Sequence, residues 1–122
     1  MTEGSSIVLI DKDRTEAKPY QVRAEILSEG SPQQCLWQGL DIAKGAITAG
    51  FWEGQPCILS IAAYPHHEIF FVTDGCIRLE GSDGTVEVAP GQSAYVPKGW
   101  SGRWHTVTQS RKHYVIFQDI PE

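Results

Sequence analysis

Two histidines stand directly before a glutamate in the stretch "AAYPHHEIFFVTDG", residues 62–75. Histidine and glutamate are ligand types that zinc, iron, manganese and nickel accept. Adjacent residues on an extended chain point to opposite faces, so His66 and His67 cannot both reach one ion without a turn. His66 and Glu68 share a face in a regular strand. A two-ligand metal site at His66 and Glu68 is therefore one alternative, and exposed histidines in a turn begun by Pro65 are the other.

Short apolar runs separated by turn residues must position these side chains. Glycine, proline and aspartate punctuate the chain, and "TDG" and "SDG" are hairpin signals. No segment carries a long apolar stripe of helical period. Many short strands at roughly 8–12 residue spacing predict an all-β sandwich or barrel. The runs are "CLWQGL", "AITAGFWEG", "CILSIAAY", "EIFFV", "CIRLEG", "TVEVAP", "SAYVP" and "RKHYVIFQ".

Length and composition narrow the class of protein. A chain of 122 residues fits one domain, and a net charge of -5 disfavours nucleic acid as a partner. Three cysteines without a C-x-x-C pair indicate a reducing compartment. No signal peptide or membrane-spanning run is found, so we expect a cytoplasmic protein without a membrane partner. The runs "EIFFV" and "YVIF" are apolar on both faces, which predicts a homodimer.

The order and spacing of these runs resemble the cupin superfamily, whose RmlC-like jelly-roll β-barrels carry two signature motifs. The first motif usually reads His-x-His, three or four residues, Glu, six residues, Gly; here Glu68 is followed by Gly75. The second usually reads Gly, five residues, Pro-x-Gly, two residues, His; here Gly91, Pro97 and Gly99 have the right separations.

Longer stretches are similar to small single-domain cupins related to ureidoglycine aminohydrolases and ethanolamine-utilisation cupins. They are "GFWEGQPC", "EIFFVTDG", "DGTVEVAPGQSAYVPKGWSGRW" and "RKHYVIF". The resemblance implies a single cupin domain over 1–122, with its core at 36–118 and an N-terminal arm over about 1–20. This group often has a cysteine after Trp-Glu, where this chain has Gly54.

The resemblance also implies where a cupin metal would be held, and this chain departs from the pattern there. Three of the four ligand positions lack a ligand, so we expect no metal at the usual place and no cofactor. In order the positions hold Ala62, Tyr64, Glu68 and Gly102, or Ile61 and Ala63 at the first two with the longer spacing.

The motif places Glu68 inside the barrel, where a carboxylate needs a partner. Tyr64, a tryptophan N–H, Lys112, Arg111, or an amine or hydroxyl of a bound molecule are the alternatives. Aromatic side chains flank the lost ligand positions, and we expect them to form a cavity rather than only core. The predicted ligand-binding residues are Trp52, Tyr64, Glu68, Phe70, Trp104 and Tyr114.

Two functions of different class follow from that cavity. The first is binding of a small metabolite, bearing an amine or a carboxylate, without a metal. The second is an enzyme of the hydrolase, isomerase or lyase kind, with Glu68 as general base and Tyr64 as acid or oxyanion donor. A third reading is an accessory dimer whose barrel is only core.

Overall fold

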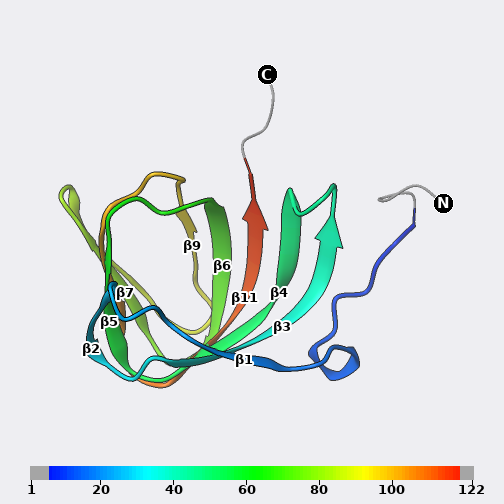
Figure 1. Cartoon of the computed structure of the whole chain (residues 1–122), viewed down its shortest axis with the longest axis horizontal. Helices are drawn as coiled ribbons and strands as arrows, with labels where there is room; N and C mark the ends of the chain where they lie inside the picture. The colour runs from blue at the N-terminus through cyan, green and yellow to red at the C-terminus, as the bar shows by residue number, and fades with distance from the viewer. Residues whose placement is uncertain (1–5, 119–122) are drawn as a thin grey trace.

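The computed structural model describes residues 6–118 as two antiparallel sheets that face each other in a jelly-roll β-barrel (Figure 1). The all-β fold expected from the turn-separated runs is confirmed. Within this described part, the only helical element is the 3-10 turn η1, Lys12–Arg14, and no helix is long and apolar enough to cross a membrane. The strands are β1 Lys18–Gln21, β2 Leu27–Gly30, β3 Gln33–Ile42, β4 Ile47–Gly54, β5 Cys57–Ile61, β6 His67–Asp74, β7 Ile77–Gly81, β8 Gly84–Val88, β9 Ser93–Val96, β10 Gly102–Thr106 and β11 Ser110–Phe117.

The strands are distributed over the two sheets with the crossovers of a jelly roll. One sheet has the order β1-β3-β4-β11-β6-β9, and the other has the order β2-β5-β10-β7-β8. The last strand, β11, lies between β4 and β6 and pairs antiparallel with both. Figure 1 shows β3, β4, β11 and β6 side by side, with β5 and β7 across the barrel from them.

The turn between β6 and β7 depends on Gly75, the glycine of the first motif. Its φ of +84° lies in the left-handed region that favours glycine. A Cβ here would lie 2.3 Å from Ser110 Oγ. That hydroxyl accepts a hydrogen bond from the Cys76 amide at 3.0 Å. Glycine therefore lets this turn pack directly against the first residue of β11.

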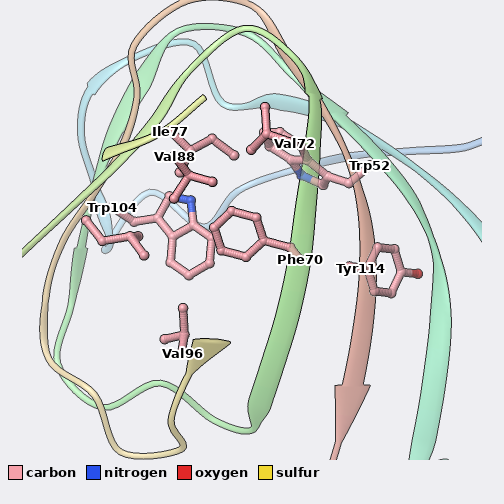
Figure 2. Close-up of a cluster of buried hydrophobic side chains, with 9 residues drawn as sticks. Trp52, Phe70, Val72, Ile77, Val88, Val96, Trp104 and Tyr114 are labelled. Carbon is pink, nitrogen blue, oxygen red and sulfur yellow. The ribbon is translucent and has the colours of Figure 1, made fainter. Parts of the chain in front are cut away.

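The apolar core lies between the sheets and is built by alternate residues of facing strands. Phe70 from β6 and Trp104 from β10 pack with their ring centroids 5.5 Å apart. Figure 2 shows these two rings side by side, with Tyr114 set apart and its hydroxyl pointing away from the cluster. The buried core residues are Trp52, Phe70, Val72, Ile77, Leu79, Val88, Val96, Trp104 and Tyr114.

Residues before the predicted core also belong to the barrel. The segment expected as an arm contains η1 and most of β1, and β1 pairs with β3 so that Tyr20 lies opposite Gln34. Figure 1 shows β1 running along one end of the barrel. The chain then crosses to the second sheet, where β2 pairs with β5. This early segment brings further side chains to the interior.

Candidate active site in the barrel cavity

The alternation of β11 decides which cation reaches the barrel interior. Lys112 and Tyr114 are buried, whereas Arg111 is exposed. Arg111 points outward and pairs with Glu53, with 2.6 Å between Nε and Oε1. Of the two cations considered as partners of Glu68, only Lys112 is inside.

Glu68 of β6 is held by two side chains inside the barrel. Lys112 Nζ lies 2.7 Å from Oε2, and the Tyr64 hydroxyl donates a hydrogen bond to Oε1. Glu68 is 2% exposed and Lys112 is 7% exposed, so water does little to screen the pair. Both carboxylate oxygens are engaged, which meets the requirement that a buried charge be paired.

Three aromatic rings lie close to the ammonium of Lys112. Nζ lies 4.6 Å from the ring centroids of Phe70 and Trp104 and 4.9 Å from that of Trp52. The ring of Tyr64 stacks on Trp104 at 5.2 Å. The electron-rich faces of aromatic rings attract a cation, especially where water is excluded. One carboxylate and three rings therefore replace part of the hydration of this amine, which also borders the cavity.

These groups form part of the wall of a cavity of about 720 Å³. A space of this size lies within the range of ligand sites, roughly 300–1,000 Å³. Most of its exposed wall is apolar, and amide, hydroxyl and charged side chains interrupt that surface. The lining includes Tyr20, Arg23, Gln34, Leu36, Gln38, Trp52, Leu59, Ile61, Tyr64, His66, Glu68, Trp104, Lys112, Tyr114 and Ile116.

Burial fixes the protonation of the phenols and of one imidazole at the cavity wall. Desolvation raises the pKa of Tyr20 and that of Tyr114 to about 12. The pKa of Tyr64 is raised well above its usual range, mainly by desolvation and to a smaller extent by the negative charge of Glu68. Desolvation lowers the pKa of His66. Near neutral pH the three phenols are thus hydrogen-bond donors, and His66 is uncharged.

Five of the six residues predicted to bind a ligand line this cavity: Trp52, Tyr64, Glu68, Trp104 and Tyr114. The sixth, Phe70, is 0% exposed and does not line it. Phe70 stands two residues after Glu68 on the inward face of β6. Its ring packs against that of Trp104 and lies 4.6 Å from Nζ of Lys112. Phe70 is thus part of the core beside the cavity, and its role in binding a ligand stays a prediction.

Sequence reasoning missed the part of the wall that precedes residue 36. The Trp52 indole donates to Oε1 of Gln34 at 2.9 Å, and the Tyr20 hydroxyl donates to the same oxygen. Arg23 also lines the cavity. Gln34 stands two residues before the lining residue Leu36 on β3, and this alternation was the available signal for it. No motif pointed to Tyr20 or Arg23.

The two adjacent histidines point to different surroundings, as their spacing predicts. His66 lines the cavity and packs edge-on against Tyr64, with ring centroids 4.9 Å apart. The Nδ1 atom of His67 lies 2.9 Å from the Tyr95 hydroxyl on the outer face. Both rings are half-buried, so neither is a fully exposed turn residue.

The residues at the usual cupin metal position do not fit a transition metal. A Cβ on Gly102 would lie 2.4 Å from the carbonyl oxygen of Glu80, so the backbone leaves no room for a histidine there. The Tyr64 hydroxyl and the Lys112 ammonium occupy both oxygens of Glu68. Across residues 6–118, no three side chains of His, Cys, Asp and Glu lie close enough to hold a metal ion.

The two-sheet barrel, with Glu68 facing inward at the position of the first motif, defines a cupin. The family model of the EutQ-like cupin domain matches residues 43–114, and the chain belongs to this family. The predicted resemblance to ethanolamine-utilisation cupins is thereby confirmed. No curated protein sequence matches the chain.

Solved structures share the fold at low identity. A protein of unknown function from Pseudomonas syringae pv. tomato is 19% identical, with a TM-score of 0.78 over 88% of this chain, which spans only 46% of that protein. A putative ethanolamine utilization protein Q from Salmonella typhimurium is 18% identical, with a TM-score of 0.61 over 84% of this chain and 96% of its own. A putative acetylacetone dioxygenase from Methylibium petroleiphilum is 9% identical, with a TM-score of 0.71 over 96% of this chain and 81% of its own. These likenesses establish the fold alone.

Proposed function

We propose that this cupin binds a small metabolite in its barrel cavity without the usual cupin metal. One observation carries the proposal: the ion pair of Glu68 and Lys112 borders a cavity of about 720 Å³. Burying two charges costs several kcal/mol for each ion, and apolar residues of similar volume often serve stability as well. A charged pair kept at the wall of a mostly apolar cavity is better explained by a ligand that it orients.

The charges at the cavity wall favour a ligand that bears a carboxylate or a carbonyl oxygen. Among the lining residues that the structure describes, Arg23 and Lys112 are cationic and Glu68 is anionic, so this part of the wall has an excess of positive charge. An oxygen facing Lys112 meets a charged donor. The rings of Trp52 and Trp104 offer apolar surface to the body of such a ligand. An amine facing Glu68 is the alternative polar group.

Native mass spectrometry of protein purified without chelators tests for a retained compound and a metal together. Phenylacetate serves as a defined probe, since quenching of the fluorescence of Trp52 and Trp104 reports entry into the cavity. We expect Lys112→Gln to weaken phenylacetate binding by about 1.5–3 kcal/mol, the usual value of a hydrogen bond to a charged group. Lys98→Gln, the same change at an exposed lysine, is the matched control and leaves binding unchanged. No retained compound, together with no quenching by phenylacetate, would refute the proposal.

A second candidate is an acid–base enzyme, favoured by the hydrogen-bonded chain of Tyr64, Glu68 and Lys112. Glu68→Gln keeps the shape but removes basicity and charge. For the retained compound as substrate, a general base would show a loss of roughly 10²–10⁴ in turnover with affinity nearly unchanged. A binding protein that uses Glu68 to hold an amine would instead lose affinity. Glu53→Gln, at a carboxylate paired with Arg111 outside the barrel, is the control.

A further inference from the structure

Among the described residues that line the cavity, Lys112 is the only lysine, and a primary amine at such a wall is a nucleophile once it releases a proton. We propose that Lys112 forms an imine with the carbonyl group of a small aldehyde or ketone held in the cavity. This inference rests on the proposed function, because the carbonyl compound must first bind there. It adds a covalent step to that function and assigns the ligand to the carbonyl compounds.

The proton that leaves Nζ has an acceptor at hydrogen-bond distance. Nζ donates to Oε2 of Glu68 at 2.7 Å, while Oε1 is held by the Tyr64 hydroxyl. Tyr64 is thus a positioning residue that fixes the carboxylate on the amine. An amine desolvated in an apolar pocket is the form that proteins use for condensation with carbonyl compounds.

The step balances with Glu68 as the sole proton carrier. Glu68 takes one proton from the ammonium, the nitrogen lone pair adds to the carbonyl carbon, and the oxygen receives the proton back from Glu68. Glu68 then takes a second proton from nitrogen and passes it to the hydroxyl, which leaves as water while the nitrogen–carbon double bond forms. The ammonium has three N–H bonds and the protonated imine has one, and the two lost hydrogens leave in water.

The surroundings of Nζ suit the product as well as the starting amine. A protonated imine carries one positive charge at the same atom, so the ion pair with Glu68 is kept. The rings of Trp52, Phe70 and Trp104, which lie 4.6–4.9 Å from Nζ, also stabilise that cation. Lys112 is 7% exposed, which limits the access of the bulk water that hydrolyses imines.

Reductive trapping tests the inference on the unmodified protein. Benzaldehyde is added with sodium cyanoborohydride at neutral pH, so that any imine becomes a stable N-benzyl lysine, and peptide mapping measures the rate at each lysine. We expect Lys112 to be labelled about tenfold faster than the exposed Lys18, Lys44 and Lys98, because the carbonyl is held beside it. Burial without reactivity gives the opposite order, with Lys112 labelled more slowly than the exposed lysines, and that result would overturn the inference.

Two variants separate chemistry from folding. Glu68→Gln removes the proton acceptor and should lower labelling of Lys112 by roughly 10²–10⁴, whereas Glu53→Gln should leave it unchanged. Thermal unfolding of each variant checks that it is folded, and the map of the unmodified protein decides the matter if Glu68→Gln is not. Binding of phenylacetate without an adduct on Lys112 would refute imine formation and leave the proposed function standing. Neither binding nor an adduct would refute both.

Discussion

Lys112 Nζ lies 2.7 Å from Oε2 of Glu68, and the two residues come from adjacent strands of the same sheet. Both residues are on the inward face of their strands. Tyr114 follows Lys112 on this face of β11, and Phe70 follows Glu68 on this face of β6. The pair therefore combines two properties: it is nearly inaccessible to bulk water and it faces a space large enough for a ligand. Substitutions can therefore measure the contribution of the pair to the free energy of unfolding separately from its role in binding or reaction.

Lys112→Met should destabilise the fold by about 3–5 kcal/mol, because it leaves the carboxylate of Glu68 buried without its cation. Adding Glu68→Gln to that variant removes the orphaned charge and should restore part of the loss, giving a coupling free energy of roughly 0.5–3 kcal/mol. Urea unfolding of the wild type, both single variants and the double variant measures it.

The matched control for this cycle is Arg111→Met on the same strand. Arg111 pairs with Glu53 on the exposed face, where water and salt screen the ion pair. Its loss should change unfolding far less than the loss of Lys112. Equal effects of the two substitutions would show that burial of the Glu68 pair has no energetic consequence.

The free energy of unfolding should decrease as the pH is lowered, and His113 on the outer face is one cause. Its ring stacks on Phe51 at 4.7 Å, and its Nε2 is buried with no hydrogen-bond partner in the described part of the chain. Desolvation lowers the pKa of His113 in the folded state. The unfolded chain therefore binds more protons, so the stability present above the ordinary pKa of about 6.5 is lost as pH falls below it.

His113→Phe removes this proton linkage and keeps a ring beside Phe51. Its free energy of unfolding should decline less than that of the wild type between about pH 7.5 and pH 5.5. His66, whose pKa is also lowered by desolvation, is present in both proteins and cancels in the comparison. An equal decline in the two proteins would exclude His113 as a source of acid sensitivity.

The barrel and five of the residues that line the cavity follow from short-range patterns. Turn residues mark the strands, and the motif spacing places Glu68 and Gly75. Alternation then puts Trp104 and Tyr114 inside. Lys112 stands two residues before Tyr114 on β11, so the same alternation places Lys112, and not Arg111, on the inward face.

The rest of the site depends on contacts that local patterns do not encode. Tyr20 reaches the cavity only because β1 pairs with β3, and Arg23 only because the chain then crosses between the sheets. Alternation places Phe70 on the inward face of β6 but does not tell whether it faces the cavity or lies in the core, where the structure has it. Whether an inward side chain lies at the cavity or in the core is decided by how the two sheets pack in three dimensions.

Metal content gives a direct check on the barrel interior. Elemental analysis after dialysis should find zinc, iron, nickel and manganese far below one equivalent, because a transition metal needs three or four protein ligands. Gly102 has no room for a side chain, and Lys112 pairs with the one remaining ligand, Glu68. Nearly one equivalent of any of these metals would contradict this expectation and direct attention to His66 beside Glu68.

The outer face of β4, β11, β6 and β9 is the surface on which we expect a homodimer. Phe71 is 44% exposed and Tyr95 is 54% exposed, and Val115 and Phe51 continue the apolar surface. A face whose central side chains carry no Asp, Glu, Lys or Arg can meet its own copy about a twofold axis without charge repulsion. Large exposed apolar patches mark such contacts.

Phe71→Lys should convert that dimer to monomers, because each copy would bring a lysine into the contact and bury it without a partner. Size-exclusion chromatography with light scattering at micromolar concentration measures the mass. Val86→Lys is the matched control, since Val86 is 56% exposed but lies on β8 of the other sheet. A wild-type monomer, or a dimer that Val86→Lys disrupts and Phe71→Lys does not, would place the contact elsewhere or exclude it.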